Sequence, residues 1–248
     1  PGKSVCFATG RMGFYALLKV LNIGEGDEVI ILGHTCSVMP NAVFRSGAKP
    51  VYSDIDLETL GSCAKEIKKV ITNKTKLVVA QHSFGIPCKI KEIARLCKEE
   101  KIFLLEDCAL TLDSRIDKKG VGNFGDAALF STDHSKPINT ITGGLVYTKN
   151  NNLSKSLRKV QIESKSLSQE VKLKIWNKLL EEAKFCNPRN YRKIQLFKAV
   201  RSFFLGHLDK KSEYLNEDFG RPPSKNYPYP AKLPTFLSAL GLKELERW

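Results

Sequence analysis

A lysine and an aspartate follow two apolar runs, at a spacing that would place both side chains at one edge of a sheet. Lys136 comes shortly after the apolar segment 126–131, and Asp107 ends a segment that begins with the apolar run 102–105. A lysine amine can form a Schiff base with an aldehyde cofactor, and a carboxylate can hold a proton on a pyridine nitrogen. The pair therefore indicates pyridoxal phosphate (PLP) chemistry, with Lys136 and Asp107 as catalytic residues. The local alternative is a solvated lysine and a structural aspartate.

Three further residues have the types and positions expected of a phosphate site. Gly10 and Arg11 stand between a first expected strand and a helix start, where backbone amides favour phosphate and glycine allows close approach. Arg11 could add a bidentate contact, and the Ser131 hydroxyl could reach the same group. The alternatives are a plain turn with an exposed arginine and a strand-end serine bonded to backbone.

Two histidines and one cysteine are weaker candidates for the pocket. His82 follows the expected strand 76–81, and His134 stands two residues before Lys136. His82 would form a pocket wall or be a hydrogen-bonded loop residue, and His134 would assist proton transfer or only line the pocket. Cys36 follows another expected strand, where its sulfur could face the cofactor ring; a catalytic thiol would need a histidine partner that the sequence does not identify.

Composition narrows the class of protein. Seven cysteines are an odd number without a CxxC pair, which argues against a disulfide framework and a zinc site, so we expect no metal and reduced thiols in a cytoplasmic protein. No apolar stretch is long enough for a membrane span. The net charge is +14, and residues 155–211 are rich in Lys and Arg. That basic segment is either a solvated helical face or a surface for anions; without a recognisable motif we expect no nucleic-acid partner.

Strand and helix patterns alternate over the first 150 residues. Strands are expected at 5–8, 28–32, 49–55, 76–81, 103–107, 126–131 and 145–148, and helices at 11–21, 37–45, 60–71 and 90–100. This alternation predicts an α/β fold with a mostly parallel sheet between helices. Active sites in such sheets form at the carboxyl ends of strands, where Asp107 and Ser131 are expected.

After residue 150 the patterns become helical. Helices are expected at 153–162, 169–185, 194–208 and 235–247, with an irregular proline-rich segment at 221–230. We expect three parts: a PLP-binding large domain (1–150), a basic helical segment (151–230) and the start of an incomplete carboxyl-terminal domain (231–248).

In order and spacing the chain resembles the DegT/DnrJ/EryC1/StrS family of PLP-dependent sugar aminotransferases. The resemblance is carried by Gly10 with its helix, LNIGEGDEVI (21–30), the segment 41–56, QHSFG (81–85), LEDCA (105–109), VGNFGDAALFS (121–131), Lys136 before Gly143-Gly144, and SALGLKEL (238–245). It implies the large domain of the aspartate aminotransferase type (fold type I), with a helical carboxyl-terminal extension here, working as a homodimer. It also implies Lys136 as the Schiff-base residue, Asp107 as the pyridine partner, and Gly10, Arg11, Ser131 and Cys36 around the cofactor.

The expected function is transfer of an amino group, from glutamate, to a nucleotide-linked keto-sugar for cell-surface polysaccharide or secondary-metabolite synthesis. The sequence departs from the family at three positions, because Arg11 replaces a common threonine, Cys36 an aromatic residue and Leu110 a polar one. Cys36, Leu110 and the short ends of what we expect to be a fragment or truncated homologue leave the alternative of a non-catalytic or regulatory PLP-fold protein. A basic module for nucleic acid or anionic membrane is a second alternative, based on residues 155–211, and another PLP reaction on a sugar or amino acid is a third.

Overall fold

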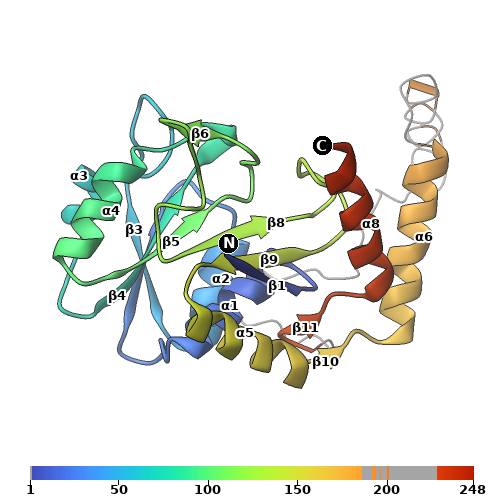
Figure 1. Cartoon of the computed structure of the whole chain (residues 1–248), viewed down its shortest axis with the longest axis horizontal. Coiled ribbons are helices and arrows are strands. Elements are labelled where there is room, and N and C mark those ends of the chain that lie inside the picture. The colour runs from blue at the N-terminus through green and yellow to red at the C-terminus, as the bar shows by residue number, and fades with distance from the viewer. Residues whose placement is uncertain (1, 186–191, 194–195, 197–199, 201–227) are drawn as a thin grey trace. The chain divides into compact units, whose positions relative to one another are not determined.

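The short apolar runs of the sequence form strands, and most of the segments between them form helices, in the computed structural model (Figure 1). The structure describes residues 2–185, 192–193, 196, 200 and 228–248. The chain divides into two units, one made of residues 1–166 and 218–248 and the other of residues 167–217. The first unit holds every candidate site residue.

A seven-stranded mixed sheet is the framework of the first unit, as far as the structure describes the chain. Its strands follow the order β1-β9-β8-β5-β4-β2-β3. Their bounds are β1 (Lys3–Phe7), β2 (Glu28–Leu32), β3 (Lys49–Ser53), β4 (Thr75–Gln81), β5 (Phe103–Asp107), β8 (Ala127–Ser131) and β9 (Gly144–Thr148). The strands from β3 to β8 in this order are parallel, whereas β9 runs antiparallel to β8 and to β1. The carboxyl ends of the parallel strands and of β1 therefore share one edge with the start of β9.

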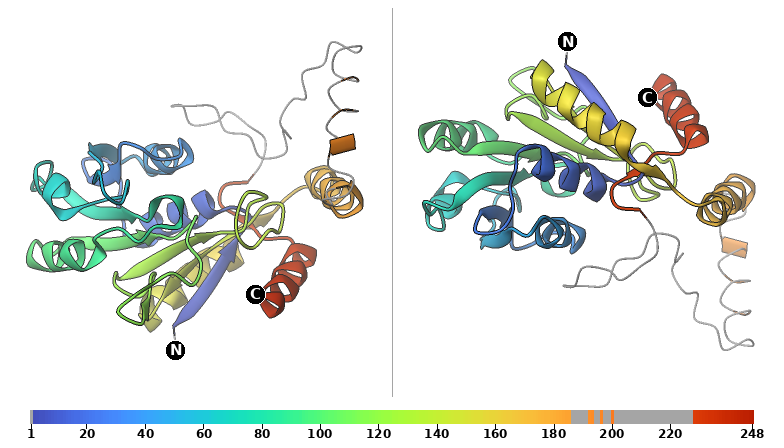
Figure 2. Two further views of the ribbon diagram at one scale, coloured as in Figure 1. Left: turned by 90° about the horizontal axis from the view of Figure 1, so that it is seen from above. Right: turned by 90° about the horizontal axis from the view of Figure 1, so that it is seen from below.

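Helices in two groups pack on this sheet (Figure 2). In the first group, α1 (Gly10–Val20) contacts β1, β8 and β9 as well as α2 (Val38–Ser46) and α5 (Asn151–Glu163). In the second group, α3 (Ala64–Lys68) contacts α4 (Ile90–Glu99), which packs on β4 and β5. All five residues of β2 are buried, which is typical of a central strand covered on both faces.

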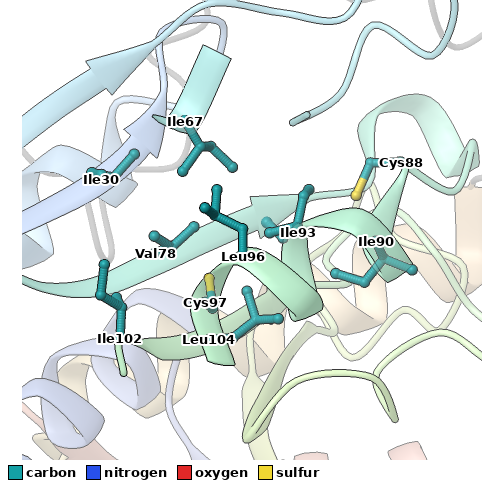
Figure 3. Close-up of a cluster of buried hydrophobic side chains, with 11 residues drawn as sticks. Ile30, Ile67, Val78, Cys88, Ile90, Ile93, Leu96, Cys97, Ile102 and Leu104 are labelled. Atoms are coloured by element: carbon teal, nitrogen blue, oxygen red, sulfur yellow. The ribbon is translucent and has the colours of Figure 1, made fainter. Parts of the chain in front are cut away.

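The apolar core between α4 and the central strands is drawn in Figure 3. Ile93, Leu96 and Cys97 of α4 pack against Val78 and Leu104 of the sheet. The neighbouring residues in each strand, such as Leu77 and Leu105, point to the opposite face of the sheet and are also buried. Both faces of β4 and β5 are therefore covered by other parts of the chain. A rigid centre of this kind fixes where each strand ends, and hence where the site residues lie.

The carboxyl-terminal segment returns to the first unit. Strand β11 (Ala231–Lys232) pairs in parallel with β10 (Lys165–Ser166), and the Ala8 amide donates a 2.9 Å hydrogen bond to the Ala231 carbonyl. The Tyr229 ring lies 5.1 Å from the Tyr15 ring, edge to face. These contacts attach the segment before helix α8 (Thr235–Arg247) to the end of β1 and to α1.

The second unit contributes helix α6 (Gln169–Phe185) to the described chain. Glu170 and Lys174, one turn apart on its surface, form a 2.7 Å ion pair. The helix expected at 194–208 and the proline-rich segment 221–230 lie mostly outside the described residues.

Most expected elements are confirmed to within two residues, whereas several short local features were not predicted, among them the β10–β11 pair. The helix expected at 60–71 is wrong outside Ala64–Lys68, because the Asp56 side chain accepts the Glu58 amide in a turn and Leu60 adopts a left-handed φ of 54°. A short hairpin, β6 (Arg115–Ile116) with β7 (Lys119–Gly120), was not expected; its two-residue turn also has positive φ.

Candidate active site

Parallel strand ends bring most of the candidate residues to one edge of the sheet. Asp107 and Ser131 are the last residues of β5 and β8, and His82 follows β4. Gly10 begins α1 just after β1, which runs in the same direction as β8. Lys136 follows β8 in a loop, where its amide donates a 2.9 Å hydrogen bond to the Asp133 carbonyl.

The start of α1 and the end of β8 form a narrow, glycine-lined corner. The Thr9 hydroxyl caps α1 by accepting the Met12 amide at 3.3 Å. A Cβ on Gly10 would lie 3.6 Å from Ser131 Cβ, and a Cβ on Gly144 would clash with the Gly10 backbone. Glycine at 144 is therefore what allows β9 to approach the helix start. The Ser131 oxygen accepts the Asp133 amide at 3.4 Å, which leaves its hydroxyl hydrogen to donate.

Asp107 is a buried carboxylate at the end of β5. Only 6% of the residue is exposed, and Oδ1 accepts a 2.9 Å hydrogen bond from the Ala109 amide. Burial raises the pKa of this carboxyl above its usual range, and the Ala109 amide and the charges of His82 and Lys136 partly oppose that shift. Asp107 is thus a buried acid at the end of a strand, and Lys136 follows the neighbouring strand β8 in a loop.

Glu106 plays a different part from its neighbour. Its side chain points to the other face of β5, where Oε1 accepts the Phe124 and Gly125 amides, both at 2.6 Å, and Oε2 accepts the Gly122 amide at 2.8 Å. Burial raises the pKa of the Glu106 carboxyl, but hydrogen bonds from His82 and these amides outweigh it and hold that pKa below its usual range. Glu106 is an ionised anchor for the segment before β8.

His82 is a buried structural residue joined to Glu106. Its Nε2 lies 3.3 Å from Glu106 Oε2, and its Nδ1 accepts the Cys88 amide at 3.1 Å, which places a proton on Nε2. With 1% exposure, its side chain is packed behind the strand ends. Among the described residues, the Cys108 sulfur lies within 4.8 Å of these His82 and Glu106 atoms. Because amides and the histidine proton already satisfy the carboxylate, we interpret this cluster as a hydrogen-bonded support.

The remaining candidates are exposed or half-buried. Cys36 is exposed in the loop after β2, and no hydrogen bond between described residues joins it to Asp107 or Lys136. The His134 side chain is 57% exposed and pairs with Asp133 at 2.7 Å. Arg11 is half-buried in the first turn of α1, where its carbonyl accepts the Tyr229 hydroxyl at 3.2 Å.

Two polar bridges at this edge, formed by Gln81 and Glu106, were not predicted from the sequence. Gln81, at the end of β4, accepts the Thr35 hydroxyl at 2.6 Å and donates to the His34 carbonyl at 3.1 Å, so it links the loops after β2 and β4. Glu106 was visible only as the neighbour of Asp107. Two adjacent acids at a strand end must point to opposite faces of the sheet, and this was the available signal that Glu106 differs from Asp107. The donors to Glu106 are backbone amides, which residue types do not reveal.

An apolar cavity of about 270 Å³ adjoins the Ser131 end of the site. Ser131, Thr132, Pro137 and Ile138 line it together with Leu237 of α8. Neither Lys136 nor Asp107 lines it. The cavity therefore borders the Lys136 loop without joining the two groups.

Comparison with known proteins identifies the family. The sequence profile of the DegT/DnrJ/EryC1/StrS aminotransferase family matches residues 2–194. The chain belongs to this family. It is 38% identical over 146 residues to GDP-perosamine synthase of Escherichia coli O157:H7, covering 59% of this chain and 40% of that protein. It is 32% identical over 160 residues to dTDP-4-dehydro-2,3,6-trideoxy-D-glucose 4-aminotransferase of Saccharopolyspora spinosa, covering 64% and 42%.

Solved structures confirm the expected fold class. NtdA from Bacillus subtilis with bound cofactor PMP matches with 26% sequence identity and a TM-score of 0.58, over 62% of this chain and 35% of that one. The α/β architecture with a mostly parallel sheet is that of PLP aminotransferases. The chain spans about two fifths of the length of the curated relatives that it matches.

The residues of the strand edge fit the family cofactor, PLP. The fit rests on a buried carboxylate whose Oδ1 accepts the Ala109 amide, a lysine in the loop after the neighbouring strand, and a glycine-lined helix start beside a serine hydroxyl. Asp107 suits a pyridine nitrogen, Lys136 an aldehyde, and the Gly10 and Ser131 corner a phosphate.

Proposed function

We propose that this chain provides the cofactor-binding part of a PLP-dependent aminotransferase that aminates a nucleotide-linked keto-sugar. The observation that carries the proposal is that the buried Asp107 carboxylate, the glycine-lined corner of Gly10 and Ser131, and the loop that carries Lys136 all lie at one edge of the sheet. Two relatives named for GDP- and dTDP-linked amino sugars support the substrate class. The products would enter cell-surface polysaccharides or secondary metabolites.

In this proposal, bound PLP supplies an aldehyde and an electron-accepting ring. Asp107 holds a proton on the pyridine nitrogen, and its raised pKa makes it ready to share that proton. Lys136 supplies the amine that holds the cofactor and moves a proton at the substrate carbon. The α1 amides and the Ser131 hydroxyl bind the phosphate, and Arg11 adds charge beside them.

The proposal extends to the amino donor, the assembly and the compartment. Glutamate is the proposed donor and a homodimer the proposed assembly, both from the family resemblance. The cysteines of the described residues are free thiols, which agrees with a reducing cytoplasm. No helix in the described part of the chain is long and apolar enough to cross a membrane.

A spectroscopic titration tests the function. We expect PLP-loaded protein to show the absorbance of covalently bound cofactor, and glutamate to shift that band to shorter wavelength as the amino form accumulates. The Lys136→Ala variant should lack the band, and Lys69→Ala, which removes an exposed lysine paired with Glu66, should keep it. A bound cofactor that glutamate leaves unchanged would favour the non-catalytic alternative suggested by Cys36 and Leu110, and an unchanged Lys136→Ala variant would refute the proposal.

A further inference from the structure

The loop that carries Lys136 is closed at its base by a threonine pair. The Thr132 amide donates to the Gly143 carbonyl at 3.0 Å, and the Thr140 amide donates to the Thr132 carbonyl at 2.9 Å. These hydrogen bonds therefore hold together the two ends of the loop 133–139, which includes Lys136. The position of the Lys136 backbone depends on this closure.

The Thr140 hydroxyl is the centre of the closure. It is buried, with 2% of the residue exposed, and lies 2.6 Å from the Thr132 hydroxyl oxygen. It also lies 3.0 Å from the Thr132 carbonyl and 3.0 Å from the Thr142 carbonyl. The Thr140 hydroxyl has one hydrogen to donate to these three oxygens, and between the two hydroxyls either can be the donor. A side chain without the hydroxyl would leave this group of oxygens short of a donor.

The next residue is held in an unfavourable conformation. Ile141 is 1% exposed and has a φ of 67°, in the left-handed region where a β-branched residue is rare. Such a conformation costs on the order of 1–3 kcal/mol and persists only where neighbouring bonds impose it. Ile141 itself donates its amide to Asn139 Oδ1 at 2.8 Å. The Thr140 hydroxyl is bonded before it, and the Thr142 hydroxyl after it donates to the Ala8 carbonyl at 2.7 Å.

The same bonds tie the Lys136 loop to the phosphate corner. Ala8 directly precedes Thr9 and Gly10, so the Thr142 bond fixes the loop to the start of α1. Gly143 lies within the closure, where a Cβ would clash with the Thr132 hydroxyl. The Lys136 loop and the start of α1 are thus both hydrogen-bonded to this group of threonines.

We propose that Thr140 is a positioning residue for Lys136, acting with Thr132 to fix the loop that carries the cofactor amine. The inference rests on the proposed function, since it concerns how well Lys136 reaches PLP. It predicts that loss of one buried hydroxyl, with no change of charge or volume, weakens the covalent attachment of the cofactor. A merely structural threonine would lower stability without this effect.

Matched substitutions in the full chain separate the two roles. Thr140→Val removes the hydroxyl, and Thr140→Ser restores it. Thr148→Val is the control, because the buried Thr148 hydroxyl also donates to a carbonyl, that of Asp126 at 2.8 Å, but at the opposite end of β9. For each variant we would measure the PLP dissociation constant from absorbance, the pH dependence of the bound band, and the urea midpoint.

The expected result is a dissociation constant about tenfold higher in Thr140→Val, equivalent to one lost buried hydrogen bond, with a shifted pH dependence. Thr140→Ser and Thr148→Val should stay within about twofold of wild type in affinity, while Thr148→Val loses comparable stability. Equal affinity and pH dependence in Thr140→Val and wild type would overturn the inference. If Thr140→Val does not fold, Thr132→Val, at a more exposed site, must show the same loss of affinity. Failure of the proposed function is distinct, because the wild type itself would then lack a Lys136-dependent band.

Discussion

Two adjacent acids at the end of β5 have opposite electrostatic roles. Glu106 accepts three backbone amides and a histidine proton, and its pKa is lowered. Asp107 accepts one amide, and burial raises its pKa. The backbone donors at this strand end are therefore directed mainly at Glu106, and Asp107 accepts fewer hydrogen bonds. A carboxylate with few hydrogen bonds is a suitable partner for a protonated nitrogen.

Replacing Asp107 by Asn should stabilise the cofactor-free protein near neutral pH. The raised pKa of Asp107 means that its favourable contribution is complete below the unfolded value of 3.8 and is lost as pH rises through the folded pKa. Asn still accepts the Ala109 amide but carries no charge, so its stabilising effect should shrink as the pH falls. Urea unfolding at several pH values measures this difference. A variant less stable than wild type at neutral pH would contradict the account, and PLP affinity should fall in the same variant.

Glu106→Gln should destabilise the protein by about 2–4 kcal/mol, because its NH₂ group must face a pair of N–H donors that the carboxylate accepts. The lowered pKa of Glu106 also gives a pH signature: its stabilisation is present above the ordinary value of 4.5 and is lost as pH falls through the folded pKa. The variant should lack this acid-dependent loss.

Urea unfolding of Glu66→Gln provides the comparison for that measurement. Glu66 pairs with Lys69 on the surface of the fold, and such pairs contribute about 0–1 kcal/mol. Equal losses of stability in the two variants would show that the amide bonds to Glu106 contribute little.

At the scale of helices and strands, the packing of β9 against α1 sets the position of the corner formed by Gly10 and Ser131. We expect Gly144→Ala to cost about 1–3 kcal/mol and to weaken PLP binding, because its Cβ would meet the Gly10 backbone at the helix start. Gly120→Ala, where the nearest atom would be Asn123 Nδ2 at 3.7 Å, should change stability by less than about 0.5 kcal/mol. Thermal melting and PLP titration of both variants would check this. A well-bound cofactor in Gly144→Ala would show that close approach is not needed.

The sequence predicted elements where local pattern decides them. The bounds of β2, β4 and β5 were predicted closely from their apolar runs, and those of α1 and α4 from their helical periodicity. The predicted helix 60–71 was too long because Asp56 and the left-handed Leu60 make a turn that periodicity does not show. Long-range features, such as the return of Tyr229 to α1, leave no local pattern.

The positions of the candidate site residues were predictable where they follow from the ends of the predicted strands. Strand ends placed Asp107, Ser131 and Gly10 at one edge, as expected from the parallel order. The interpretation of His82 as a pocket wall is not favoured, because its side chain is bonded between Glu106 and Cys88 behind the strand ends. Such bonds to backbone amides depend on the folded path of 122–125 and cannot be read from residue types.

At the scale of the whole molecule, the first unit joins residues 1–166 with 218–248. It contains the sheet, the Lys136 loop and α8, while α6 belongs to the second unit. The chain spans about two fifths of the length of the curated relatives that it matches. In the proposed function, the first unit provides the Gly10 and Ser131 corner for phosphate, Asp107 for a ring nitrogen and Lys136 for the aldehyde.

Chemical trapping tests that central claim most directly. Reduction of the PLP-loaded chain with borohydride makes any lysine attachment permanent, and peptide mass spectrometry then locates it. The account predicts that the label at one PLP per chain lies on Lys136, and that Asp107→Asn lowers its extent. Label spread over surface lysines, or concentrated on another lysine while Lys136 remains free, would contradict it.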